Sequence, residues 1–199
     1  MLQDQFREEV ATKQKKGAET VLFLLAWVML IVFGIGAFLM LTSLFNTVPQ
    51  VLAGNLVNEA GVPYTFVDVL PEIVLCLAMA ACAVLLYLKK DMIRTEYEYT
   101  ITNAQMDFAA VYNNQKRKSL GTMNLKNISA AGMVASGSFQ RYIGMQGVKT
   151  SNWFVNRDAQ LMYVYFQKND QRRIIVFEPS EEMVQMIKKV LVPGVWQVN

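Results

Sequence analysis

The chain has 199 residues, a length that suits one soluble domain together with a small membrane part. Apolar residues make up 53% and charged residues 18%, and the apolar excess lies before residue 90. A formal net charge of +3 without a long basic run argues against a nucleic-acid-binding arm. Histidine is absent and the two cysteines lie in an apolar stretch, which excludes the common zinc sites, histidine-based acid–base catalysis and a disulfide framework.

Residues 1–18 are polar and of mixed charge, and we predict a cytoplasmic N-terminal tail here. Leu2, Phe6 and Val10 recur every four residues, a spacing typical of a short amphipathic helix that could rest on a membrane through its lysines. A frayed tail is the alternative interpretation.

A first membrane span is predicted at residues 20–45, because no residue from Thr20 to Phe45 is charged. A bilayer core needs about 20 apolar helical residues, and this run exceeds that length. A buried core helix of this length would have a polar face. A cleaved signal peptide is disfavoured by the length and by the acidic residues in front of the run.

The second span is predicted at residues 69–88, with Pro71 in its first turn. Glu72 is then expected at the membrane surface, where a helix N-terminus favours a negative charge; the alternative is an intramembrane ion or proton path. Residues 19–90 therefore form a two-helix hairpin with an external loop at 46–68. Small residues on both helices, including Gly34, Gly36 and Ala37, are expected to permit close packing.

Lysine and arginine residues flank the hairpin at both ends, whereas the loop between the spans contains none. By the positive-inside rule, this pattern predicts a multi-pass protein of the cell membrane whose N- and C-termini are both cytoplasmic.

Residues 91–199 have the pattern of a β-rich domain. Alternating side chains predict strands at 95–102, 105–112 and 116–125, joined by turns at 103–104 and 113–114. Further strands are expected within 128–135, from Trp153 to Val155, and at 160–167 and 172–177, with a long loop at 136–151. The end is helical over 180–192, with Ser180 as N-cap. The predicted fold class is α+β, with six or seven antiparallel strands in a curved sheet or partly open barrel capped by the C-terminal helix.

Three segments stand in order behind the two predicted spans: EYEYTITNAQMDF at 96–108, KRKSL at 116–120 and IIVFEPSEEM at 174–183. With these segments the chain resembles a group of uncharacterised two-span membrane proteins of Firmicutes, which carry a C-terminal bacterial pleckstrin-homology-like (PH-like) domain. The resemblance covers most of the chain and implies a bacterial membrane protein with that fold. It supplies no activity and no functional residues.

The basic residues of the domain are candidates for contact with anionic lipid or a partner: Lys116, Arg117, Lys118, Arg172 and Arg173. Solubilising decoration and protection of strand edges is the competing interpretation.

Three aromatic residues in or beside the long loop, Tyr142, Trp153 and Phe154, are candidates for a binding groove. Packing into the core is the interpretation that we favour for them.

No catalytic constellation or glycine-rich phosphate loop is present in the sequence, so we predict neither an enzyme nor a bound cofactor or metal. The predicted function is a membrane-anchored interaction or scaffolding module, whose partners are membrane lipids and a protein or further copies of itself, and not nucleic acid. The alternatives are a module that binds or senses anionic lipid at the inner leaflet and a small transport or channel subunit.

Overall fold

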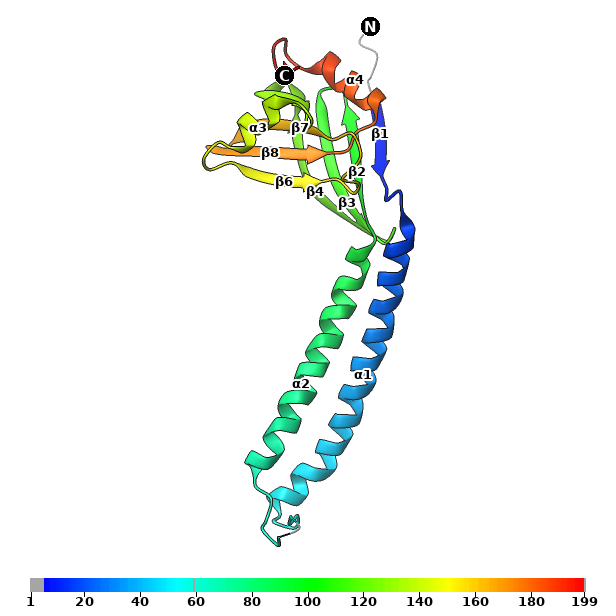
Figure 1. The fold of residues 1–199 in the computed structure, drawn as a ribbon, viewed down its shortest axis with the longest axis vertical. Helices are drawn as coiled ribbons and strands as arrows, with labels where there is room; N and C mark the ends of the chain where they lie inside the picture. Colours follow the sequence, from blue (N-terminus) through cyan, green and yellow to red (C-terminus); the bar gives the residue numbers. More distant parts are fainter. Residues whose placement is uncertain (1–5, 59, 199) are drawn as a thin grey trace. The chain divides into compact units, whose positions relative to one another are not determined.

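The computed structural model describes residues 6–58 and 60–198, which form two compact units (Figure 1). The helical unit comprises residues 17–93. The β-rich unit combines residues 6–16 with residues 94–198. The boundary after the helices lies within a few residues of the expected one, but the N-terminal segment belongs to the β-rich unit.

The helical unit contains α1 (Lys16–Leu52) and α2 (Phe66–Lys89), followed by the short 3₁₀ helix η1 (Lys90–Ile93). Both helices are longer than predicted, and at 1.5 Å per residue they measure about 55 and 36 Å. Thr65 is the N-cap of α2, and its backbone N–H donates to Asp68 Oδ2 at 2.8 Å. Pro71 therefore lies inside α2 and not in its first turn as expected.

The two helices contact each other through small residues, as their sequence indicates. A Cβ atom on Gly36 would lie 2.1 Å from Met79 Cε, and Cys76 Sγ donates to the Ala37 carbonyl at 3.6 Å. A Cβ atom on Gly34 would meet nothing within 4 Å, so this glycine takes no part in the contact.

The first sheet has the strand order β1-β2-β3-β4 and is antiparallel throughout. Its strands are β1 (Phe6–Ala11), β2 (Thr95–Thr102), β3 (Gln105–Tyr112) and β4 (Lys116–Asn124). The meander of β2, β3 and β4 confirms the predicted strands. Asn103, Asn113 and Asn114 adopt positive φ at the two turns, a conformation that asparagine tolerates better than most residues.

The expected amphipathic helix or frayed tail at the N-terminus was wrong for residues 6–11, which form β1 and pair with β2. Phe6 and Val10 lie on the exposed face of this strand, while Arg7 and Glu9 face the other way. Glu9 accepts a 2.9 Å hydrogen bond from the Ser180 backbone N–H and another from the Ser180 hydroxyl. Arg7 forms a 2.5 Å ion pair with Glu182. Leu2 lies outside the described residues.

The second sheet has the order β6-β8-β7-β5-β9. Its strands are β5 (Ala130–Met133), β6 (Lys149–Trp153), β7 (Met162–Lys168), β8 (Gln171–Phe177) and β9 (Trp196–Gln197). The β6–β8 and β5–β9 pairs are parallel, which corrects the expectation of six or seven antiparallel strands. The predicted loop at 136–151 contains α3 (Gly137–Ile143) and the start of β6, which ends at Trp153 where a strand was expected to begin.

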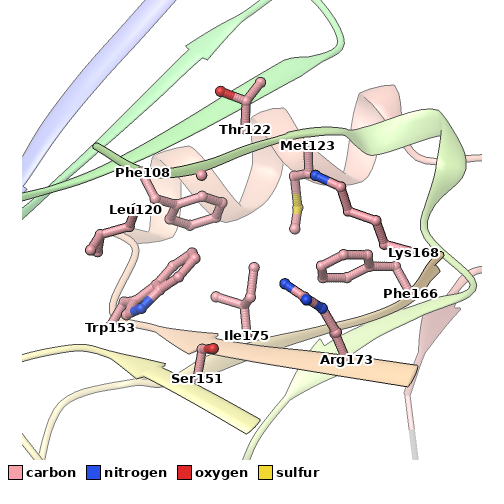
Figure 2. Close-up of a pocket in the computed structure, with 11 residues that line it drawn as sticks. Phe108, Leu120, Thr122, Met123, Ser151, Trp153, Phe166, Lys168, Arg173 and Ile175 are labelled. Atoms are coloured by element: carbon pink, nitrogen blue, oxygen red, sulfur yellow. The ribbon is translucent and has the colours of Figure 1, made fainter. Parts of the chain in front are cut away.

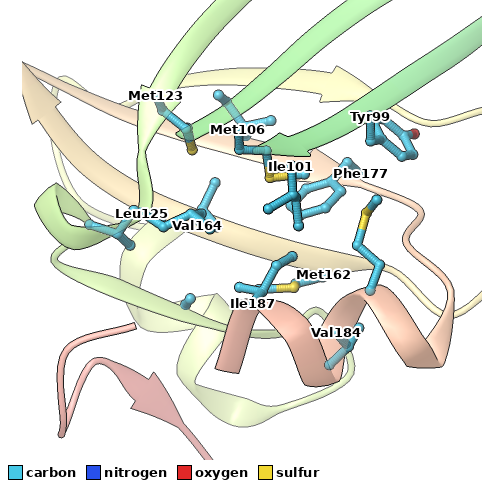
Figure 3. Close-up of a cluster of buried hydrophobic side chains, with 14 of the residues drawn as sticks. Tyr99, Ile101, Met106, Met123, Leu125, Met162, Val164, Phe177, Val184 and Ile187 are labelled. Atoms are coloured by element: carbon cyan, nitrogen blue, oxygen red, sulfur yellow. The ribbon is translucent and has the colours of Figure 1, made fainter. Parts of the chain in front are cut away.

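Both sheets contribute to one hydrophobic core, which α4 (Glu181–Val190) covers (Figure 3). Tyr99, Met106, Val164 and Phe177 are fully buried between the sheets. Ile187 on α4 packs into the same core as Met183 and Val184 from the preceding turn. The Ser180 hydroxyl accepts from Met183 N at 3.2 Å, which confirms the predicted N-cap.

Candidate functional site

The face of the second sheet that looks toward the first sheet changes from apolar to cationic along its strands. Strand pairing places Trp153, Phe177 and Met162 side by side in one row. The next row contains Ser151, Ile175 and Val164, and the row after that contains Lys149, Arg173 and Phe166. Since successive residues of one strand alternate between faces, all nine of these side chains share the inward face.

A cavity of about 90 Å³ lies where this face meets β3 and β4 (Figure 2). Its apolar wall includes Phe108, Met123, Trp153 and Ile175, and the Phe108 and Trp153 rings are 4.9 Å apart at their centroids. Polar side chains enter from Ser151, Thr122, Lys168 and Arg173. The cavity thus combines an aromatic and aliphatic wall with two cationic groups.

Arg173 is the unusual residue of this cavity, because it points inward from β8, a strand with neighbours on both sides. Figure 2 shows its guanidinium directed into the space between Phe166, Ile175 and Met123. One guanidinium nitrogen donates to Gln171 Oε1 at 2.8 Å, while Nε is buried without a hydrogen-bond partner. A buried N–H of this kind is costly unless something accepts from it.

The predicted basic residues do not form one patch. Lys116 and Lys118 project from one face of β4 and Arg117 from the other, because strand side chains alternate. Arg117 donates to Glu98 at 2.5 Å, and this bond raises the pKa of Arg117. On β8, Arg172 is exposed and lies on the face opposite to Arg173.

The three aromatic candidates are also separated. Trp153 lines the cavity on the inward face. Tyr142 and Phe154 pack on the outward face of the second sheet, in a cluster that includes Phe139 of α3, and the Tyr142 ring lies 4.8 Å from that of Tyr165. Packing, the favoured interpretation, describes all three residues, and Trp153, which packs against the shared core, also lines the cavity.

Tyr99 ties the cavity wall to the rest of the core. Its hydroxyl donates to the Trp153 carbonyl at 2.5 Å and accepts from Glu178 N at 3.4 Å. Burial raises the pKa of Tyr99 well above its usual range. The hydrogen bond to Trp153 fixes the end of β6.

Sequence reasoning missed the inward orientation of Arg173 and the contributions of Phe166 and Lys168. The signal was present, because Arg173, Ile175 and Phe177 alternate in phase, as do Val164, Phe166 and Lys168 on the partner strand. Within residues 6–58 and 60–198, no group of three or more Cys, Asp or Glu residues is arranged to hold a metal ion.

Two sheets that share one core, with a C-terminal helix packed into it, define the class of fold as a PH-like domain. Over residues 56–196, more than half of its length, the chain matches the family described as Bacterial PH-like domain (DUF6106), and the chain belongs to this family. The resemblance to bacterial PH-like proteins is thereby confirmed. No curated protein and no solved structure matched the chain.

Proposed function

We propose that this protein is a membrane-anchored interaction module. The observation that carries the proposal is the exposure of the two long helices, since only 6% and 11% of the residues in their most apolar windows are buried. Lipid would cover apolar side chains such as Leu24, Phe38 and Leu85, which would otherwise face water.

In the proposed topology both helices cross the cell membrane and the loop between them is external. The absence of Lys and Arg from that loop and their presence at both flanks of the hairpin support this orientation. The PH-like domain and both termini are then cytoplasmic.

The proposed role of the PH-like domain is to bind a protein partner, or a second copy of the chain, without catalysing a reaction. Its support is the lack of a readable catalytic constellation together with a separate β-rich unit in the same chain as the hairpin. The separation of the basic residues on β4 and β8 favours a protein-binding role over one that depends on a single basic lipid-binding patch.

Cysteine labelling tests the topology. With Cys76 and Cys82 replaced by alanine, single cysteines are placed at Asn55 in the inter-helix loop and at Lys126, an exposed residue of the β-rich unit. We expect a membrane-impermeant maleimide to label position 55 on intact cells, and position 126 only after permeabilisation. Labelling of both positions on intact cells, or of neither, would contradict the topology.

Co-purification of the full-length chain from native membranes tests the binding role. The wild type is compared with a variant in which the exposed Lys116 and Lys118 are replaced by glutamate. A stoichiometric partner, or a second copy, that is retained by the wild type and weakened by the charge reversal supports the role. The non-enzymatic part of the proposal would be contradicted if the purified protein turned over a substrate and single substitutions abolished that turnover.

A further inference from the structure

We propose that the cavity between β3, β4 and the inward face of the second sheet binds a small carboxylate with a short apolar stem. This proposal goes beyond the anchoring role and does not depend on the membrane topology. Every residue that it uses belongs to the β-rich unit.

The first argument is the position of Arg173. An inward-pointing charge at the edge of a sheet can be explained as protection against unwanted strand pairing. Arg173 is on β8, which pairs with both β6 and β7, so this explanation does not apply to it. A cation on the inward face of a central strand is costly unless an anion meets it.

The second argument is the missing counter-charge. Across the described ranges 6–58 and 60–198, Arg173 and Lys168 form no ion pair with a carboxylate, and the one acceptor of Arg173 is the neutral amide oxygen of Gln171. The buried Nε–H of Arg173 has no acceptor. A planar guanidinium with a free N–H matches a planar carboxylate, which can accept from two of its N–H groups at once.

The third argument is the composition of the remaining wall. Phe108, Met123, Trp153 and Ile175 offer an apolar surface, and Figure 2 shows them around the space that the guanidinium enters. A hydrated inorganic anion gains little from such a wall, whereas a hydrocarbon stem gains from every methylene that it buries. At about 90 Å³ the cavity is small for a ligand site, which limits the enclosed part to a carboxylate and a short stem.

The stem would lie against the aromatic rings and the carboxylate would accept from Arg173. Lys168, which is exposed at the cavity rim, would add a longer-range attraction. Burying the carboxylate would satisfy the Nε–H of Arg173.

Tryptophan fluorescence tests the proposal on the full-length chain in nanodiscs of zwitterionic lipid. Trp27 and Trp196 are replaced by phenylalanine so that Trp153, in the cavity wall, is the tryptophan that reports. Acetate, propionate, butyrate, hexanoate and inorganic phosphate are titrated separately. We expect a saturable change with the carboxylates, and an affinity that rises about fourfold per methylene until the stem outgrows the cavity.

Arg173→Met and Arg172→Met form a matched pair, since neighbouring residues lose the same charge and only one faces the cavity. We expect Arg173→Met to weaken carboxylate binding at least tenfold. Its melting midpoint should be unchanged or raised, because the substitution removes a half-buried charge that has no counter-charge and a buried Nε–H that has no acceptor. Arg172→Met should bind within about twofold of the wild type. Lys168→Met should weaken binding by less than Arg173→Met.

Three outcomes would overturn the proposal: no response to any carboxylate at millimolar concentration, equal affinity for phosphate and hexanoate, or equal loss of binding in both arginine variants. A lowered melting midpoint of Arg173→Met would show that its loss of binding comes from misfolding. Arg173→Lys, which keeps the charge but loses the planar fork, would then decide, because the proposal requires it to bind more weakly than the wild type.

Discussion

The helical unit and the β-rich unit place the same kinds of side chain in opposite environments. Phe38 on α1 is 64% exposed, whereas Phe177 on β8 is completely buried. In the β-rich unit, the strands and α4 turn their apolar residues toward one shared core. In the helical unit most apolar side chains face outward, and a small cluster around Val69 and Cys76 is buried between the helices. Apolar content alone therefore does not locate a core. The periodicity of the apolar residues along each helix or strand decides which side chains are buried.

The sharpest test of this contrast replaces the same residue type in both units. Phe177→Ala should destabilise the β-rich unit by about 3–5 kcal/mol, because it leaves a cavity beside Tyr99 and Phe108. Phe38→Ala should cost less than about 1 kcal/mol, because a side chain that is 64% exposed makes few contacts within the protein, and would make few if lipid surrounded it. Thermal unfolding of the full-length protein in nanodiscs measures both, and equal destabilisation would break the contrast.

A charge on the outer surface should be tolerated by the β-rich unit and not by the helices. Ile31 on α1 is 52% exposed, and Ile31→Arg should cost about 2.5–3.5 kcal/mol of membrane insertion if lipid surrounds it. Val198→Arg is the control, at a site that is 78% exposed, and should change stability by less than about 0.5 kcal/mol. The measurement is the amount of each variant that remains in the membrane fraction after a carbonate wash, relative to the wild type. Full recovery of the Ile31 variant would argue that α1 does not lie in lipid.

Tyr99→Phe removes the tyrosine hydroxyl and should lower the free energy of unfolding of the β-rich unit by about 1–3 kcal/mol. The reason is that the Trp153 carbonyl loses its donor and the Glu178 N–H loses its acceptor. Tyr87→Phe, on the exposed surface of α2, is the control and should have little effect. Melting midpoints of both variants and of the wild type are compared at neutral pH.

The same substitution has a pH signature. In the unfolded chain Tyr99 ionises near its usual pKa of 10.0, whereas burial raises the pKa of Tyr99 in the folded protein. The folded state therefore binds more protons above pH 10, and stability that is fully present below that pH is lost as the pH rises toward the folded-state pKa. In Tyr99→Phe the melting midpoint should therefore fall less steeply between pH 9 and 11 than in the wild type. The fall that remains would come from Tyr97 and Tyr163, whose pKa values burial also raises. An unchanged slope would contradict this assignment.

The smallest expected effect concerns the attachment of β1. Glu9→Ala removes the acceptor at the first turn of α4, and should destabilise the β-rich unit by about 0.5–2 kcal/mol, as expected for the loss of a capping group. Glu8→Ala, at an exposed neighbouring position on the same strand, should be close to neutral. Hydrogen exchange of the β1 amides locates the effect, and equal exchange in the two variants would show that Glu9 does not hold this strand.

Local patterns were sufficient where one segment carried its own signal. The absence of charge from residue 20 to 45 predicted α1, and the turn residues Asn103, Asn113 and Asn114 predicted the meander. Ser180 and the acidic residues after it predicted where α4 begins. Local patterns failed where pairing depends on a distant segment. Phe6 and Val10 have the spacing of a helix, yet residues 6–11 pair with β2, which lies far along the chain.

The sequence by itself determined the two apolar helices, the β-rich domain behind them and the terminal helix, because composition and periodicity are properties of each segment alone. Only the tertiary structure decided that the N-terminal residues complete the first sheet, that β6 runs parallel to β8, and that α3 lies within the predicted loop. It also placed Arg172 and Arg173 on opposite faces of β8. The cavity that Arg173 enters is lined by residues of β3, β4, β6, β7 and β8. The physical reason is that strand pairing and burial are set by partners distant in sequence, and one inward-facing arginine becomes meaningful only when the opposite wall is known.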